Sequence, residues 1–311
     1  MAEENQKIDV LIIGGGPAGL TAAIYTSWLG LKTVVLESGI IGGRAGLAPQ
    51  IENFPGFEFG IKGSELVEKI RLQTLRFGAE IRDNEEVIGL DLKGEVKRVV
   101  SRKQTYEAHA VIIATGTQRR KLLVPGETDF IGRGVSYCVT CDGPFFKHAT
   151  VAIVGNGEEA AIDALFLSDI ANNVLIVTNE QELDISGTLI DRLRNKLNVE
   201  IIKGKITRIV GEHAVKTIKI LDFDTQLEAE REVKGVFVSL GGVPLTAIVK
   251  NAGVATDRNG CLTVDRQLKT SIEGVFAAGD CTCGGMQVVT AAGEGAMAAM
   301  RASAYVRKAN A

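Results

Sequence analysis

The sequence has little of what several classes of protein require. Among its 311 residues it has three histidines and one tryptophan, and the first apolar run is broken at Gly14-Gly15-Gly16-Pro17, too early to span a bilayer. Its net charge is −3, and its lysines and arginines are spread along the chain. They form no basic cluster that would bind nucleic acid or an anionic membrane. Residues 1–9 are polar and acidic, unlike a signal peptide. We therefore expect a cytoplasmic protein whose partner is a small molecule or another protein, with no nucleic acid and no membrane.

The five cysteines are an odd number without an export signal, which argues against a structural disulfide framework. Zinc would need a second pair of ligands beside Cys138 and Cys141, and no other cysteines or histidines stand at ligand spacing, so we predict no metal. Asp142 and the Gly143-Pro144 turn follow the pair and favour a loop over a packed helix. A redox-active, catalytic disulfide is expected, and two buried unreactive thiols are the alternative.

Residues 8–37 have the pattern of a dinucleotide-binding unit: a strand, a glycine turn, a helix, a second strand and an acid. Gly14 permits the tight turn, Gly16 lets the backbone approach a pyrophosphate, and Gly19 lets the helix pack on the strand. The free N–H groups of the helix then face the phosphates. Glu37 stands where a carboxylate accepts a ribose hydroxyl. The pattern predicts nucleotide binding here.

Residues 149–178 repeat this 30-residue unit. Its turn reads Gly155-Asn156-Gly157-Glu158-Glu159-Ala160. The acids of this turn would face an incoming pyrophosphate, and Thr178 replaces the ribose carboxylate. Two interpretations stay open: the acids complement the helix dipole, or the nucleotide site, built on Gly155, Gly157 and Ala160, is altered or lost.

Three further apolar runs end in glycine or aspartate, at residues 111–116, 236–241 and 274–280, and a helix is expected over 290–306. Together these elements predict an α/β protein of two Rossmann-like, three-layer, doubly wound domains, the second inserted into the first. The first domain is expected over 1–117 and 246–311, and the inserted domain over 118–245.

These features resemble the low-molecular-weight thioredoxin reductase family over essentially the whole chain. The motifs that carry the resemblance are Gly14-Gly15-Gly16-Pro17-Ala18-Gly19, Gly42-Gly43-Arg44, Glu52-Asn53-Phe54-Pro55-Gly56, Ala114-Thr115-Gly116, Cys138-Val139-Thr140-Cys141-Asp142 and Gly279-Asp280. The resemblance implies a homodimeric flavoprotein with FAD in the first domain, and NADPH and the redox disulfide in the second. Electrons would pass through FAD and the disulfide to thioredoxin.

The resemblance also implies site residues. Residues 37–44 would line the ribose and pyrophosphate of FAD, with Asn53 beside the isoalloxazine. Asp280, with Met286-Gln287-Val288, would close the flavin site, although an aspartate after a strand can equally cap a helix.

The redox residues have implied roles as well. Cys141 would face the flavin, Cys138 would attack the substrate disulfide, and Asp142 would act as the general acid. Residues 116–119 and 242–246 would form a hinge between the domains.

The sequence departs from the family in the second unit. Members that use NADPH have a His-Arg-Arg run that holds the 2′-phosphate, where this chain has Thr178-Asn179-Glu180. Thr178 also has no carboxylate that could accept the ribose 2′-hydroxyl of NADH. Met286 stands where NADPH-using members tend to have arginine. We therefore expect either weakly bound NADPH or a different donor, a reduced ferredoxin or deazaflavin.

Two other functions remain open: an FAD-dependent dithiol oxidase, which needs no pyridine nucleotide, and a non-catalytic flavin redox sensor, against which Asp142 argues. For the three remaining cysteines we expect at most a minor role. Cys261 is expected to be a thiol in a surface turn without a role, and Cys281 and Cys283 to be packing residues or an auxiliary relay.

Overall fold

The computed structural model describes residues 6–48, 50–51 and 53–309, and the chain divides into two compact units. The first unit contains residues 1–118 and 243–311, and the second contains residues 119–242. The first boundary between the units falls after residue 118, one residue from the predicted boundary after residue 117. The second falls after residue 242, three residues from the predicted boundary after residue 245.

The chain crosses between the units in two short strands that pair with each other, β7 (Thr117–Arg119) and β16 (Gly242–Pro244). In the second unit Arg120 N–H donates to Gly241 O at 3.3 Å, and in the first Leu245 N–H donates to Gly116 O at 3.0 Å. Both crossings fall within the segments predicted as a hinge.

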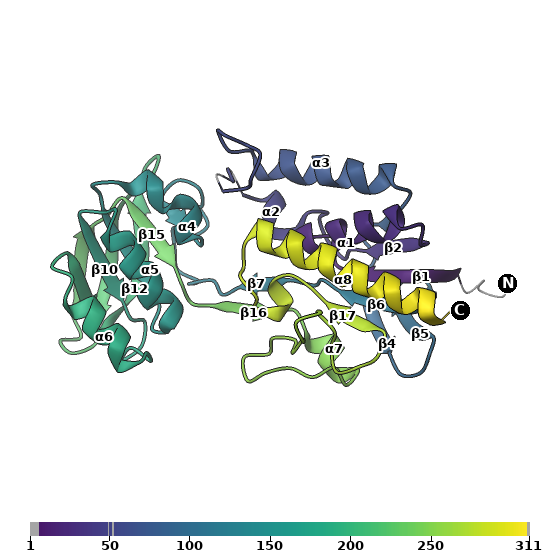
Figure 1. Ribbon diagram of the computed structural model, residues 1–311. Coiled ribbons are helices and arrows are strands. Elements are labelled where there is room, and N and C mark those ends of the chain that lie inside the picture. Colours follow the sequence, from purple (N-terminus) through teal and green to yellow (C-terminus); the bar gives the residue numbers. More distant parts are fainter. Residues whose placement is uncertain (1–5, 49, 52, 310–311) are drawn as a thin grey trace. The chain divides into compact units, whose positions relative to one another are not determined.

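The first unit is built on a seven-stranded sheet in the order β3-β2-β1-β6-β5-β4, with β17 also paired to β6 (Figure 1). The strands are β1 (Gln6–Ile13), β2 (Thr33–Leu36), β3 (Glu80–Arg82), β4 (Val87–Asp91), β5 (Lys97–Ser101), β6 (Thr105–Ile113) and β17 (Val275–Ala277). The central pairings of β1 with β2 and β6, and of β6 with β17, are parallel. Parallel strands are covered on both faces, which explains their near-continuous apolar sequences.

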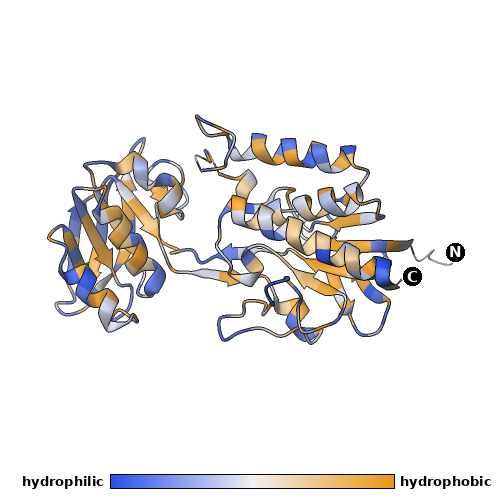
Figure 2. Ribbon diagram, in the orientation of Figure 1, coloured by the Kyte–Doolittle hydropathy of each residue, from blue (hydrophilic) through white to orange (hydrophobic). Residues whose placement is uncertain are grey.

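Helices cover one face of this sheet, where α1 and α8 pack against each other (Figure 1). The helices of the first unit are α1 (Pro17–Trp28), α2 (Gly43–Gly46), α3 (Gly63–Arg76), α7 (Ala247–Asn251), the 3-10 helix η2 (Asp280–Thr282) and α8 (Val288–Ala309). A second apolar core lies on the other face, beneath α7 and residues 254–262. Figure 2 shows the apolar residues concentrated on the central strands.

The second unit has a parallel sheet in the order β11-β10-β9-β15-β8 and an antiparallel sheet in the order β12-β13-β14. Its strands are β8 (Val135–Ser136), β9 (Thr150–Val154), β10 (Asn173–Val177), β11 (Val199–Ile202), β12 (Gly204–Gly211), β13 (Val215–Asp222), β14 (Glu228–Glu232) and β15 (Gly235–Val238). Its helices are α4 (Val139–Asp142), the 3-10 helix η1 (Gly143–Phe146), α5 (Glu158–Ser168) and α6 (Gly187–Arg194).

Three layers make up the second unit. One apolar core joins the parallel sheet to α5 and α6, and another joins it to the antiparallel sheet. The prediction of two Rossmann-like units is confirmed, and the helix expected over 290–306 extends from Val288 to Ala309. In the described part of the chain, no helix has both the length and the apolar character of a membrane span.

Candidate redox and cofactor sites

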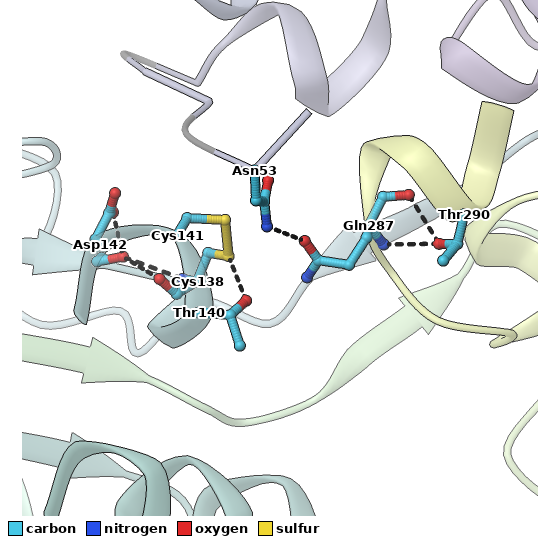
Figure 3. The surroundings of a disulfide bond; sticks show 8 residues. Asn53, Cys138, Thr140, Cys141, Asp142, Gln287 and Thr290 are labelled. Carbon is cyan, nitrogen blue, oxygen red and sulfur yellow. Dashed lines mark hydrogen bonds between the residues drawn. A yellow bond between two sulfur atoms is a disulfide. The ribbon is translucent and has the colours of Figure 1, made fainter. Parts of the chain in front are cut away.

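Cys138 and Cys141 form a disulfide at the start of α4 in the second unit (Figure 3). Cys138 is the N-cap of this single helical turn, which brings the two Cα atoms to 5.3 Å. Val139, between them, is buried and fixes the turn to the apolar core below. The sequence expectation of a loop was therefore too simple, because this Cys-x-x-Cys motif forms one turn of helix.

Asp142 is held close to this disulfide by Ser136, a residue that the sequence analysis did not select. Ser136 Oγ donates to Asp142 Oδ2 at 2.6 Å and accepts from Cys138 N–H at 3.0 Å. Thr140 Oγ1 lies 3.5 Å from Cys138 Sγ (Figure 3). One hydroxyl thus links the carboxylate to the backbone of the first cysteine, so the carboxylate has a fixed position beside the redox pair.

The glycine turn of the first unit has the close approaches that its spacing predicts. Gly14 has a φ of +108°, and a Cβ there would lie 2.2 Å from Ala114 O. A Cβ on Gly19 would lie 1.8 Å from Gly14 O, so helix and turn are in direct backbone contact. By contrast, no atom of the described residues lies within 4 Å of a Cβ added to Gly16, at the N-cap of α1. That opening faces the first turn of the helix, where a pyrophosphate fits.

Glu37 lies at the end of β2, where a ribose-binding carboxylate is expected. Its Oε2 accepts Gly15 N–H at 2.7 Å, and its Oε1 accepts Gly39 N–H at 2.7 Å. Ser38 Oγ also donates to Oε1, at 3.5 Å, so Oε2 is the oxygen with a second lone pair for a ribose hydroxyl. A pocket next to this acid in the same unit is lined in part by residues that the sequence analysis missed, among them Ser64, Arg71 and Asp83.

Arg44 joins two predicted site segments within the first unit. Its Nη1 donates to Thr117 Oγ1 and lies 3.4 Å from Asp280 Oδ2. Its Nε is buried and has no hydrogen-bond partner among the described residues. A buried guanidinium N–H without a partner is costly, and a phosphate oxygen would satisfy it. The first unit therefore fits a nucleotide with a diphosphate.

The loop that carries Asp280 is anchored by Glu294 of α8, another residue that the sequence analysis missed. Gly279 N–H donates to Glu294 Oε2 at 2.7 Å, and Thr282 Oγ1 donates to the same oxygen at 3.2 Å. Burial raises the pKa of Glu294. The contact of Glu294 with this loop follows no recognised sequence spacing. It joins the loop to the second turn of the following helix and is visible only in the folded chain.

Asn53 and Gln287 are brought together, with Asn53 Nδ2 donating to Gln287 Oε1 at 3.0 Å (Figure 3). Glu52, in the same motif as Asn53, lies outside the described residues. Met286 is exposed, and Val288 begins α8. The other predicted residues also lie at turns or helix starts: Pro17 and Ala18 in α1, Gly42 and Gly43 at α2, and Thr115 and Gly116 after β6.

The second glycine turn has the backbone of the first but not its side chains. A Cβ on Gly155 would lie 2.2 Å from Ser239 O, Gly157 is the N-cap of α5, and Ala160 is buried. Glu158 and Glu159 occupy the first turn of α5. The structure brings these acids to the helix N-terminus where a pyrophosphate would bind.

The expectations for two other cysteines are wrong. Cys261 is buried and forms a second disulfide with Cys283, with Cα atoms 5.8 Å apart. Cys261 is therefore not a surface thiol, and Cys283 is not a free packing residue. Their pairing was not predicted, since a partner 22 residues away in the sequence cannot be recognised from spacing alone. Cys281 is buried in the apolar core, and burial raises its pKa to about 11. Among the described residues, no group of three potential ligands could hold a metal ion.

Comparisons with known proteins agree with this arrangement. The family model described as pyridine nucleotide-disulphide oxidoreductase matches residues 8–295. A thioredoxin reductase from Listeria innocua is 40% identical over 313 residues, covering 99% of this chain and 97% of the relative. The chain belongs to the pyridine nucleotide-disulphide oxidoreductase family. It is a flavin-dependent disulfide oxidoreductase, and its cofactor is FAD.

Solved structures extend the comparison. The thioredoxin reductase of Streptococcus pyogenes matches with a TM-score of 0.91 at 35% identity, covering 98% of this chain and 100% of that one. A ferredoxin-flavin thioredoxin reductase from Clostridium acetobutylicum matches with a TM-score of 0.52 at 34% identity, covering 97% and 99%. Of these two structures, the second has a name that includes ferredoxin, and the first has a name that states no electron donor.

Proposed function

We propose that this chain is a thioredoxin reductase that passes electrons through FAD and the Cys138–Cys141 disulfide to thioredoxin. The observation that carries the proposal is the disulfide with Asp142 fixed beside it through Ser136. Bound FAD supplies two electrons to the disulfide. The relatives named thioredoxin reductase support the acceptor.

Each residue of the motif has a chemical role in this proposal. Once the pair is reduced, the Cys138 thiolate attacks the thioredoxin disulfide and forms a mixed disulfide, because only a thiolate attacks. Cys141, on the flavin side, attacks the Cys138 sulfur, which restores the internal disulfide and releases the thioredoxin dithiol. Asp142 gives a proton to a departing sulfur, and its bond to Ser136 keeps it in place. A passive sensor has no need for this proton donor.

The FAD site that we propose lies in the first unit. The turn at Gly14, Gly16 and Gly19 receives the pyrophosphate with Arg44, and Glu37 accepts the ribose hydroxyls. The remaining residues of the proposed site are Pro17, Ala18, Gly42, Gly43, Asn53, Ala114, Thr115, Gly116, Gly279, Asp280, Met286, Gln287 and Val288. The chain is proposed to act as a homodimer in the cytoplasm, where thioredoxins are kept reduced.

We propose reduced ferredoxin or a deazaflavin as the electron donor in preference to NADPH. Glu158 and Glu159 would repel the pyrophosphate at Gly155 and Gly157. Glu180 stands where an arginine would hold the 2′-phosphate. Each missing charge-assisted hydrogen bond weakens binding by about 1.5–3 kcal/mol, or roughly 10- to 150-fold. The relative named for ferredoxin supports this choice.

An anaerobic titration of the FAD-loaded enzyme tests both parts of the proposal. Flavin absorbance is followed while NADPH, reduced ferredoxin or a reduced deazaflavin is added, and thioredoxin follows. We expect bleaching by ferredoxin or deazaflavin, recovery with thioredoxin, and little change with micromolar NADPH. Rapid bleaching by NADPH would contradict the donor proposal. Hydrogen peroxide formation from a dithiol in air, without thioredoxin reduction, would identify a dithiol oxidase instead.

A further inference from the structure

The second disulfide joins a fixed turn to a weakly held segment of the first unit. On the fixed side, Asp257 and Cys261 exchange two hydrogen bonds: Asp257 N–H donates to Cys261 O, and Cys261 N–H donates to Asp257 Oδ1, both at 2.9 Å. Leu262 N–H donates to Cys281 O at 2.9 Å. Cys261 itself is only 5% exposed. This side would therefore keep its position without the disulfide.

The other side of the disulfide is held much less firmly. Cys283 has a φ of +60°, in the left-handed region that a cysteine rarely adopts, and Met286 has a φ of +50°. Residues 284–286 are exposed, and none of their backbone N–H groups donates a hydrogen bond to a described residue. Backbone N–H hydrogen bonding resumes at Gln287, whose N–H donates to Thr290 Oγ1 at 3.2 Å. Gly284 and Gly285 pack against the side chains of Glu294 and Thr290, and the disulfide is the covalent restraint at the start of the segment, next to the bond from Cys283 N–H to Asp280 O at 3.0 Å.

We propose that Cys261–Cys283 is a second, reversible redox centre that controls the order of residues 283–287. This rests on the proposed function, in which Met286 and Gln287 help to close the flavin site and thioredoxin is the electron acceptor. In the oxidised state the disulfide holds the segment closed. In the reduced state the left-handed residues relax, and the flavin site is less completely closed.

The reductant is the product of the enzyme itself, the thioredoxin dithiol. One thiolate of thioredoxin attacks Cys283 Sγ, since Cys283 is the less buried residue of the pair, and Cys261 leaves as a thiolate that takes up a proton. The second thiol of thioredoxin then attacks the mixed disulfide and frees Cys283. Two electrons and two protons move, so two new thiols form in the enzyme and one disulfide forms in thioredoxin. Accumulated product thus slows further reduction, and oxidised thioredoxin reverses the change.

Cys281 takes no part in this exchange. It is fully buried, and its raised pKa keeps it a thiol. It therefore provides a matched control within the same loop, since Cys281→Ala keeps both disulfides.

Thiol labelling of the wild-type FAD-loaded enzyme is the first test. The oxidised enzyme is incubated with excess reduced thioredoxin, quenched with a denaturing alkylating reagent, and digested for mass spectrometry. We expect new labels on both cysteine pairs. Labels on Cys138 and Cys141 alone would overturn this inference and leave the proposed function intact. Labels on neither pair would overturn both, and labels on Cys261 and Cys283 alone would overturn only the proposed function.

Deuterium exchange of backbone amides tests the structural consequence. In Cys261→Ala/Cys283→Ala, the hydrogen-bonded amides of residues 283 and 287 are expected to exchange about tenfold faster than in oxidised wild type, with residues 256–262 unchanged. Wild-type enzyme reduced by thioredoxin should show the same exchange rates as the variant. This measurement tests the proposal even if the variant does not fold. Cys281→Ala should match oxidised wild type. Equal exchange in the oxidised and reduced wild-type enzyme would overturn the proposed control.

Discussion

The two glycine turns have nearly the same backbone and different chemistry. Gly14 and Gly155 approach the end of the neighbouring strand equally closely, since an added Cβ would lie 2.2 Å from Ala114 O in one unit and from Ser239 O in the other. In both units the residue after that strand donates its N–H across the sheet at 2.8 Å. The backbone of a Rossmann turn is therefore determined by a few glycines and alanines, whatever the unit binds.

The side chains around these turns differ at matching positions. Counting from the first glycine of each turn, Glu37 corresponds to Thr178, and Ala22 of α1 corresponds to Asp163 of α5. Asp163 Oδ2 accepts a hydrogen bond from Ser239 Oγ at 2.7 Å, in a place where the first unit has only apolar atoms. The first unit thus has no acid in the first turn of its helix and has Arg44 for a phosphate, whereas the second has Glu158 and Glu159 in that turn and Asp163 further along the helix. The same fold supports nucleotide binding in one unit and presentation of a disulfide in the other.

The largest expected effect comes from removing the Cys138–Cys141 disulfide of the second unit, through which all electrons are proposed to reach thioredoxin. Cys138→Ser should lower thioredoxin reduction by on the order of 10³-fold or more, because serine cannot act as the exchanging thiolate. The measurement is the rate of thioredoxin reduction under anaerobic conditions with the best donor from the titration. FAD content should stay at the wild-type level. Retention of more than a tenth of the activity would rule out a role for this pair as the electron relay.

Alanine at the open glycine of each turn tests the difference in ligand binding. Gly16 and Gly157 have similar extended backbones, with φ of −76° and −94°, and no described atom would contact an added Cβ in either. Gly16→Ala should weaken FAD binding about 100-fold, because the methyl group displaces the pyrophosphate from the helix N-terminus. Gly157→Ala is the matched control and should leave FAD affinity unchanged. Affinities come from flavin fluorescence titration of the apoprotein, with thermal unfolding as the check on folding.

Arginines can be added to the second unit to make it more like the NADPH-using members. Asn179→Arg/Glu180→Arg should tighten NADPH binding about tenfold, which is the low end for a single charge-assisted bond, because Glu158 and Glu159 remain and still repel the pyrophosphate. Isothermal titration calorimetry measures the affinity. Asn179→Gln/Glu180→Gln is the control that removes the acid without adding a positive charge. If the control improves binding as much as the arginines do, repulsion by Glu180 is the whole effect.

The smallest expected effect comes from changing Asp163 of α5, whose carboxylate accepts a hydrogen bond from Ser239 Oγ. Burial raises the pKa of Asp163 to about 6, so the folded state keeps a proton that the unfolded chain loses near its ordinary value of 3.8. Between these values the unfolded state binds fewer protons, and stability therefore falls as pH rises from about 4 to 6. Asp163→Asn should remove this decline and stabilise the protein by roughly 3 kcal/mol at pH 7. Urea unfolding at pH 4 and 7 measures it, with Asp191→Asn on the exposed face of α6 as control. A pH dependence unchanged by Asp163→Asn would assign the decline to other groups.

The fold and the redox pair were predictable because their signals are local. The glycine turns at Gly14 and Gly155 are short patterns between apolar runs, and the Cys138–Cys141 pair closes within one helical turn. Ser136 and Glu294 were missed because serine and glutamate have many roles, and only the folded chain shows which groups they meet. The same reason applies to the second disulfide, whose partners come from separate loops.

The insertion of the second unit also has a consequence during protein synthesis. In the first unit β6 pairs with β17 and α1 packs against α8, and both partners are encoded after residue 242. The second unit is continuous in the chain, so it can fold as soon as it leaves the ribosome. At about 5–20 residues per second, the 67 residues from 243 to 309 take roughly 3–13 s to make. During that interval the nascent chain holds a finished disulfide-bearing unit beside an incomplete flavin unit, whose exposed apolar sheet edge is a natural substrate for chaperones.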